Sequence, residues 1–309
     1  MKVCLVAVAI GDNYVEAYTF LFRKSHEAYA EKHGYDFRVE TDYLEPRYPD
    51  KAVCSLNKIL VCSQPWSAQY DFIVFIDCDI YINIGAPPIH LCMDFGDKIG
   101  IINEYDQVVG FEQYVEMVRQ ALNWGTAPEY YAKAGFTLDT ELMLNTGVLV
   151  MQPAKHGEFL RDVFDRHYKT CLTHPRGFHY EQAAIGYELQ TNSMFTILPK
   201  QFNAIWFIQK LINEQKRVEA RLKVNNDGIS YIIHRRMSGE GQETKESCIN
   251  RINQYFRDNY FTHLAASQNH ERVFEFEQIN IELSNNEASR KGSRRPRRPE
   301  TVHDTAGSN

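Results

Sequence analysis

The chain has 309 residues, of which 44% are hydrophobic and 24% are charged. This composition is typical of a soluble globular protein with one large α/β domain or two smaller ones. The formal net charge of -6 argues against broad nucleic-acid binding by the folded part. No apolar run reaches the length of a membrane span, so we expect no transmembrane segment.

Strands and helices alternate in the first part of the chain. Val3–Ala9 is predicted to be a buried strand and Gly11-Asp12-Asn13 the turn after it. Tyr14–Lys32 has apolar residues at helical spacing, Gly34 fits the C-terminal cap, and Tyr35–Thr41 is a second strand. This strand–helix–strand order with short links predicts a right-handed parallel unit.

The later elements are predicted from the same periodicities. Helices are expected at Leu56–Cys62, Phe111–Leu122, Gly157–Cys171, Tyr180–Gln190, Asn250–Leu264 and Arg272–Ile281, and a loop at Gly125–Gly135. Strands are expected at Phe72–Ile76, Ile99–Asn103, Leu142–Met151, Thr196–Leu198 and Ile229–His234. Aromatic residues could stack on sugar rings, although most of them are assigned to the core: Trp124, Tyr130, Tyr131, Trp206 and Phe207.

From Ser284 onward the sequence is rich in Gly, Ser, Pro and Arg and nearly lacks apolar residues. We therefore expect a folded domain over residues 1–283 and a disordered basic tail over 284–309. The cluster Arg294-Arg295-Pro296-Arg297-Arg298 could bind an anionic surface or simply remain solvated.

The seven cysteines are scattered and never form a C-x-x-C pair. This pattern indicates reduced thiols rather than a disulfide framework or a zinc site. Val3–Ile10 lacks the cleavage pattern of a signal peptide. We therefore expect a cytoplasmic protein.

The stretch Tyr70–Asn83 has the clearest functional signal. Its apolar run Phe72–Ile76 ends in Asp77-Cys78-Asp79. If the strand continues, both carboxylates project from one face, roughly 7 Å apart at the backbone. Two charges at the end of a core strand are costly without a positive partner, and a divalent cation is the simplest one. The alternative is a capped strand end with two solvated acids.

Three further features have both a functional and a structural interpretation. Asn145-Thr146-Gly147 interrupts an apolar strand, where glycine marks either a bulge or a close approach by a ligand. Glu181-Gln182 begins a helix, where acids are favoured by the helix dipole alone. His234 ends a late strand and could be structural, or could complete a carboxylate and imidazole site with Asp79 that suits manganese.

In order and spacing, these motifs resemble the GT-A-fold glycosyltransferases. More narrowly, they are similar to the retaining galactosyl-, mannosyl- and xylosyltransferase family of fungi and plants. The matching segments are His33-Gly34-Tyr35, Lys58, Tyr70–Asn83, Leu144–Gly147, Glu181-Gln182, Leu198-Pro199 with Asn203, and His234 with Gly239. The resemblance implies a single Rossmann-like nucleotide-diphospho-sugar transferase domain whose mostly parallel central sheet is flanked by helices.

The resemblance also implies a role for each residue. Asp79 and His234 would ligate Mn²⁺ or Mg²⁺, and Asp77 would share the metal or touch the ribose. Gln182 would lie near the anomeric carbon with Glu181 beside it, so that the catalytic set is Gln182, Glu181 and Asp77. The donor would be bound by Ala9, Gly11, Asp12, Tyr14, Lys58, Asp77, Cys78, Asn145, Gly147 and Gly239.

The implied reaction moves a hexose or pentose from a UDP- or GDP-sugar to a hydroxyl of a glycan or glycoconjugate, with retention at the anomeric carbon. One alternative is a catalytically inactive sugar-nucleotide or glycan-binding protein on the same fold. Another is an aspartate-nucleophile phosphatase, which also has a D-x-D after an apolar strand, although Tyr81 stands where that class has Thr or Val.

Overall fold

The computed structural model describes residues 1–83, 85–108, 110–175, 180–205 and 262–264. His234 and Gly239, the strand predicted at Ile229–His234 and the predicted tail lie outside these residues. So do Trp206, Phe207 and the helix predicted at Arg272–Ile281. Within the described ranges, no helix combines the length and apolar character that crossing a bilayer requires.

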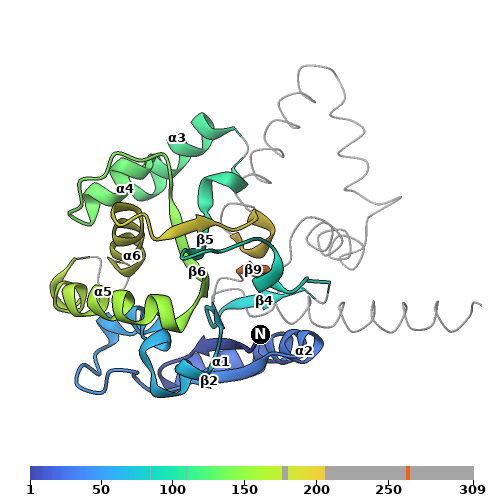
Figure 1. Ribbon diagram of the computed structural model, residues 1–309. Coiled ribbons are helices and arrows are strands. Elements are labelled where there is room, and N and C mark those ends of the chain that lie inside the picture. The colour runs from blue at the N-terminus through green and yellow to red at the C-terminus, as the bar shows by residue number, and fades with distance from the viewer. Residues whose placement is uncertain (84, 109, 176–179, 206–261, 265–309) are drawn as a thin grey trace, which may run out of the picture.

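The centre of the molecule is a six-stranded sheet with the order β2-β1-β3-β6-β5-β7 (Figure 1). Its strands are β1 (Val3–Val8), β2 (Asp36–Glu40), β3 (Phe72–Ile76), β5 (Ile99–Asn103), β6 (Leu144–Met151) and β7 (Phe195–Ile197). In this sheet β6 is antiparallel to both of its neighbours, and the other pairings are parallel. The predicted mostly parallel α/β sheet is therefore confirmed.

A smaller sheet lies beside the first and has the order β4-β9-β8. Its strands are β4 (Ile80–Ile82), β8 (Ala204–Ile205) and β9 (Thr262–Leu264). The last of these was predicted to be the end of a helix, and that prediction is wrong for Thr262–Leu264. The chain therefore leaves the central sheet at Ile76 and enters the second sheet at Ile80.

Helices flank the central sheet. The α-helices are α1 (Asp12–Leu21), α2 (Arg23–His33), α3 (Phe111–Leu122), α4 (Ala127–Lys133), α5 (Pro153–Thr173) and α6 (Tyr180–Thr191). The 3₁₀ helices are η1 (Lys51–Val53), η2 (Ser55–Ser63), η3 (Pro65–Gln69), η4 (Ile89–Leu91), η5 (Glu104–Gln107) and η7 (Lys200–Phe202).

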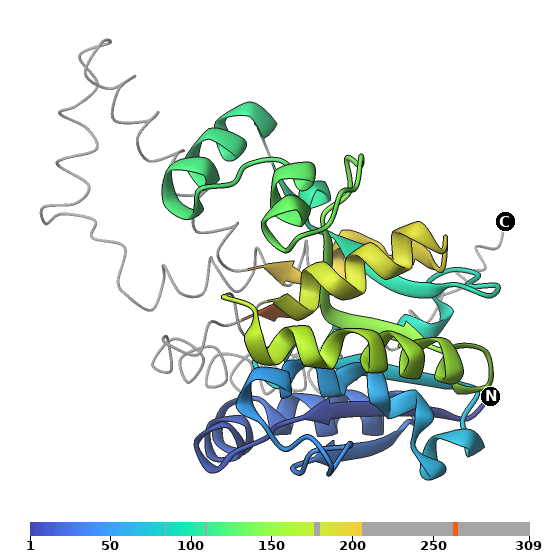
Figure 2. The ribbon, with the colours of Figure 1, turned by 90° about the vertical axis from the view of Figure 1, so that its left-hand side faces the viewer.

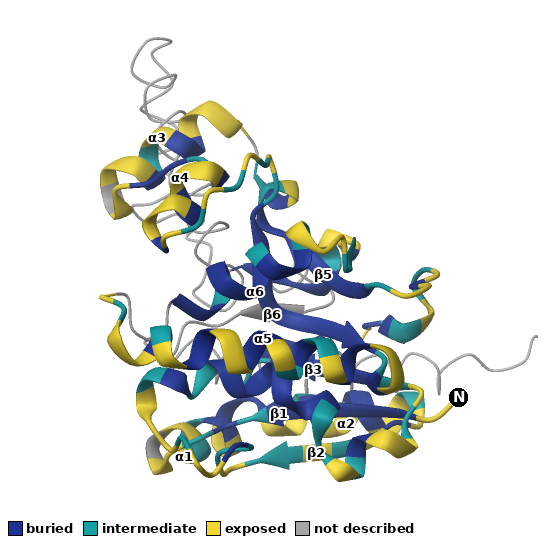
Figure 3. Ribbon diagram, turned by 60° about the vertical axis from the view of Figure 1, so that its left-hand side comes forward, coloured by how far each residue is buried: buried dark blue, intermediate teal, exposed yellow. Residues whose placement is uncertain are grey.

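The central strands of the sheet are buried on both faces, and they are dark blue in Figure 3. Alternation along β1 places Cys4 and Val6 in one hydrophobic cluster and Val3 and Leu5 in another. The first cluster includes residues of η2, α5 and α6, and the second includes residues of α2 and β4. Burial on both faces explains why β3 is a continuous apolar run.

The segment predicted as one helix from Tyr14 to Lys32 is two helices that meet at Phe22. Helix α1 packs on the end of β1, where Tyr18 and Phe22 cluster with Ala7. Helix α2 instead contributes to the cluster that contains β4. The predicted cap at Gly34 is confirmed by its left-handed conformation, with φ 66°.

The predicted loop at Gly125–Gly135 contains helix α4, so that prediction is wrong. Thr126 and Glu129 form a capping box, in which each side chain accepts a hydrogen bond from the other residue's backbone. The Thr-x-x-Glu pattern was therefore the missed signal. The rings of Tyr130 and Tyr131 are buried, which confirms their assignment to the core.

Helix α5 lies directly against η2, as Figure 2 shows. The contact depends on Gly157, because a Cβ at this position would be 2.8 Å from the carbonyl oxygen of Cys62. This close approach matters for function, since η2 carries Lys58.

We therefore expect Gly157→Ala to destabilise the protein. Alanine normally stabilises a helix by about 1 kcal/mol relative to glycine, but overlap with a backbone oxygen costs roughly 1–3 kcal/mol. Urea unfolding measures the net change. The control is Glu158→Ala on the exposed side of the same helix, for which we expect little change. A more stable Gly157→Ala protein would contradict the packing described.

Candidate active site

The D-x-D motif lies in a tight turn between β3 and β4. The Asp77 N–H donates to the Gly147 carbonyl over 2.8 Å, and the Ile80 N–H closes the turn on the Asp77 carbonyl over 3.2 Å. The prediction that the two carboxylates share one face of a continuing strand is therefore wrong. The chain turns here because β4 pairs with β9 in the second sheet.

Lys58 is the cationic partner of two carboxylates. Its Nζ lies 2.9 Å from Asp77 Oδ1 and 2.8 Å from Glu181 Oε1. Burial by itself would lower the pKa of Lys58, but the two carboxylates outweigh this effect and raise it. The ammonium is therefore charged, and a lysine already compensates Asp77, where the sequence suggested a divalent cation.

Glu181 is a buried acid that is held from two sides. Besides the Lys58 ion pair, its Oε1 accepts a 2.7 Å hydrogen bond from the Thr146 hydroxyl. Helix α6 begins one residue earlier, at Tyr180, so the acid lies in the first turn as predicted. Through Lys58 and Thr146, Glu181 connects α6 to η2 and β6.

Asp79 differs from Asp77 in its ion pairs among the residues that the structure describes. None of the Lys, Arg or His side chains that the structure describes forms an ion pair with it. Burial and then the charge of Asp77 raise the pKa of Asp79 to about 7. The carboxyl groups of Asp77, Asp79 and Glu181 thus share one described cation, Lys58.

A network of amides surrounds a second buried acid, Glu104. Its Oε1 accepts hydrogen bonds from Asn145 Nδ2 at 2.8 Å and Gln182 Nε2 at 3.1 Å. Burial raises the pKa of Glu104, and these hydrogen bonds oppose the rise. Asn145 Nδ2 also donates to Gln182 Oε1 at 3.2 Å. The side chain of Gln182 is therefore oriented by both Glu104 and Asn145.

The other side of Asn145 faces Gly147 and Asn203. Asn145 Oδ1 accepts from the Gly147 N–H at 2.9 Å and from Asn203 Nδ2 at 2.8 Å. A Cβ on Gly147 would lie 3.3 Å from Asp77 Oδ2 and as close as 3.0 Å to Asn145 Oδ1. Glycine at this position therefore lets polar atoms from several elements come together.

A β-bulge produces this arrangement. Ile101 pairs with Leu149, but the next residue of β5, Ile102, pairs with Asn145. The extra residues of β6 between these pairs include Thr146 and Gly147. Gly147 thus lies in a β-bulge, as its structural interpretation predicted. The bulge also brings Asn145 to Glu104 and Thr146 to Glu181.

An open cleft of about 600 Å³ lies at the end of β1. Its lining residues are Ile10, Gly11, Asp12, Tyr14, Thr41, Asp42, Tyr43, Lys51 and Cys54. Gly11, Asp12 and Tyr14 belong to the predicted donor-binding set, whereas Ala9 is fully buried. Because β1 and β3 pair in parallel, with Val6 opposite Phe75, the end of β1 that borders the cleft lies beside the turn that follows β3.

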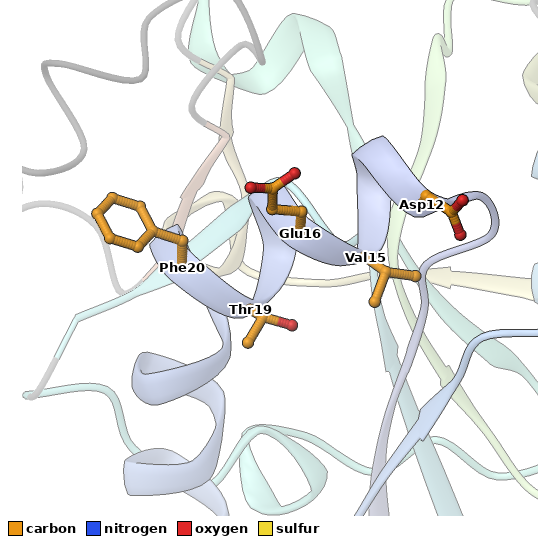
Figure 4. Close-up of a pocket in the computed structure, with 5 residues that line it drawn as sticks. All are labelled: Asp12, Val15, Glu16, Thr19 and Phe20. Carbon is orange, nitrogen blue, oxygen red and sulfur yellow. The ribbon is translucent and has the colours of Figure 1, made fainter.

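A second hollow, of about 680 Å³, follows one side of α1 (Figure 4). It is lined by Asp12, Val15, Glu16, Thr19 and Phe20. Asp12 lines both hollows, so the first turn of α1 borders the cleft on one side and this hollow on the other.

The structure thus brings together Lys58, Asp77, Asn145, Gly147 and Glu181, with Gln182 joined through the amide network. Cys78 is half-buried within the turn. Sequence reasoning missed Glu104, which directly follows the buried strand β5 just as Asp77 follows β3. An acid immediately after an apolar strand was the available signal.

The described ranges contain no group of three His, Cys, Asp or Glu side chains that could hold a metal ion. They supply two candidate ligands, the carboxylates of Asp77 and Asp79. Hard oxygen donors of this kind suit Mg²⁺ and Mn²⁺.

Neither a protein-family model nor a curated protein sequence matches the chain. Solved structures do match. A glycosyltransferase involved in the glycosylation of the major capsid of PBCV-1 aligns with a TM-score of 0.50 and 14% identity, covering 90% of this chain and 100% of that one. The chain has the GT-A glycosyltransferase fold.

Two further glycosyltransferases align more weakly. The galactosyltransferase LgtC, in complex with donor and acceptor sugar analogues, gives a TM-score of 0.49 and 14% identity, covering 88% of this chain and 94% of that one. The bifunctional glycosyltransferase WbbM in its apo form gives a TM-score of 0.46 and 12% identity, covering 89% of this chain and 49% of that one. None of the three is described as a member of the fungal and plant family, so that narrower resemblance stays a prediction.

Within this GT-A fold we expect Lys58→Met to be strongly destabilising. It would leave Asp77 and Glu181 without their cation, and breaking a buried ion pair in this way costs about 3 kcal/mol. Lys155→Met is the control, because Lys155 pairs with the exposed Asp97 at the surface and should matter little. Equal unfolding midpoints for the two variants in urea would contradict the role given to Lys58.

Proposed function

We propose that this protein is a metal-dependent glycosyltransferase. It moves a hexose or pentose from a UDP- or GDP-sugar to a hydroxyl of a glycan or glycoconjugate, with retention at the anomeric carbon. One observation carries the proposal: on a GT-A fold, Asp77 and Asp79 lie in one tight turn beside an open cleft. Among the described residues, only Asp77 of these two aspartates forms an ion pair, with Lys58.

The proposed metal is Mn²⁺ or Mg²⁺. Asp79 is the first proposed ligand, because a divalent cation offsets the negative charge that Lys58 leaves uncompensated. Asp77 shares the site through Oδ2, since its Oδ1 is engaged by Lys58. His234, outside the described residues, is the proposed third ligand. When bound, the metal would stabilise charge on the departing diphosphate as a Lewis acid.

The cleft is the proposed site for the nucleoside. Gly11, Asp12 and Tyr14 supply its wall at the end of β1, which is where ligands lie in open α/β sheets. Its volume of about 600 Å³ is in the range of small-molecule sites. Lys51 adds a positive charge to the same wall.

Asn145, Gly147 and Gln182 are proposed to contact the transferred sugar. Amide side chains offer both donors and acceptors to hydroxyl groups, and Glu104 holds two of these amides in fixed orientations. Because Gly147 has no side chain, Asn145 Oδ1 and Asp77 Oδ2 can lie close together beside its backbone.

Retention requires either a carboxylate nucleophile or attack from the face that the diphosphate leaves. Glu181 is already engaged by Lys58 and Thr146, which reduces its strength as a nucleophile. We therefore propose that the acceptor hydroxyl attacks from the face that the diphosphate leaves, with Gln182 near the anomeric carbon. Glu181 and Asp77 keep Lys58 charged beside it.

We expect Asp79→Asn to abolish metal-dependent donor binding. In a thermal-shift screen of UDP- and GDP-sugars, at least one donor should raise the melting temperature of the wild type only with Mn²⁺, because a ligand that binds only the native state stabilises it. The variant should lose this shift, and its transfer rate should fall by about 100-fold, the equivalent of about 2.7 kcal/mol of lost charge stabilisation.

Asp97→Asn is the matched control, because Asp97 is an exposed acid paired with Lys155. It should keep both the shift and the transfer. Unchanged metal-dependent transfer by Asp79→Asn would overturn the proposal. Donor binding without turnover in the wild type would favour the inactive binding protein, and an acyl-phosphate on Asp77 would favour the phosphatase.

A further inference from the structure

Strand β4 leaves the D-x-D turn with one edge paired to β9. Two side chains of α2 also reach its backbone. His26 Nε2 lies 2.7 Å from the Ile80 carbonyl oxygen, and Ser25 Oγ accepts from the Ile82 N–H at 3.2 Å. Because buried backbone groups need partners, α2 here takes the place of a neighbouring strand.

The protonation of His26 follows from its surroundings. The imidazole is fully buried, and burial lowers its pKa to about 4, against smaller opposite effects of the Ile80 carbonyl and Glu27. The ring is therefore neutral at pH 7. A carbonyl only accepts, so Nε2 carries the proton and Nδ1 accepts from the Tyr18 hydroxyl at 3.2 Å.

Ile80 directly follows Asp79, so this bond acts on the exit of the turn. The turn is also held at its entrance, by the Asp77 N–H on the Gly147 carbonyl, and closed by the Ile80 N–H on the Asp77 carbonyl. Neither of these bonds restrains the peptide group between Ile80 and Tyr81, which contains the Ile80 carbonyl. His26 supplies that restraint, and Tyr18 orients His26 from α1.

We propose that His26 is a positioning residue, which fixes Asp79 relative to Asp77 so that the two carboxylates bind one divalent cation. The inference deepens the proposed function and rests on it. His26 does not touch the cation itself. It acts through the backbone of Ile80, as groups behind metal ligands commonly do.

The test compares two substitutions of His26 in the full chain. His26→Gln keeps an N–H donor near the position of Nε2, whereas His26→Leu keeps the apolar volume and removes the donor. The Mn²⁺ dissociation constant is measured by EPR of free Mn²⁺, with Mn²⁺ as the only added ligand. His26→Leu should weaken Mn²⁺ binding by about 10- to 100-fold, and His26→Gln should restore most of it.

His156 provides the matched control. It is also fully buried, its Nδ1 accepts from the Gln152 N–H at 2.9 Å, and its Nε2 lies 3.2 Å from the Asp97 carbonyl, on a different part of the fold. His156→Leu should lower the unfolding midpoint as His26→Leu does, yet leave Mn²⁺ affinity unchanged. A purely structural role for His26 predicts no such difference between the two.

A folded His26→Leu protein with wild-type Mn²⁺ affinity, or equal weakening by His156→Leu, would overturn the inference alone. If His26→Leu does not fold, Tyr18→Phe removes the bond to Nδ1 and should weaken Mn²⁺ binding by a smaller factor; unchanged affinity would again count against it. Absence of Asp79-dependent Mn²⁺ binding in the wild type would overturn the proposed function as well.

Discussion

The ion pairs of Lys58 with Asp77 and Glu181 are the interaction on which the site depends. They join η2, the turn after β3 and the first turn of α6, and the Thr146 hydroxyl adds β6. The buried Lys58 and Glu181 would each be unfavourable alone, as would the partly exposed Asp77 to a smaller degree. Their mutual compensation lets polar groups collect at the carboxyl edge of an apolar sheet without breaking it.

Among the described residues, the same arrangement leaves Asp79 without an ion pair and sets three carboxyl groups against one lysine. Lys58 can offset about one negative charge, while the cluster has Asp77, Asp79 and Glu181. A site with this imbalance favours a cation that brings its own anionic ligand, and a divalent metal with a nucleotide diphosphate meets that description. The electrostatics of this turn therefore link the proposed chemistry to the fold.

Much of the fold followed from local pattern. The apolar run before Asp77 predicted β3, and the glycine at 147 marked a bulge. The turn at Asp77 could not be predicted, because β4 leaves the sheet to pair with β9, far along the chain. Glu104 was missed although it follows a buried strand, since one acid at a strand end is common and its amide partners come from distant segments.

The most direct test of the central claim is an anomalous difference map at the manganese absorption edge, from crystals soaked with Mn²⁺ and a nucleoside diphosphate. A peak within coordination distance of both Asp77 and Asp79, about 2.2 Å from carboxylate oxygens and adjacent to the cleft at Gly11, is the predicted result. Nucleotide bound in the cleft with no manganese at the two aspartates would contradict it.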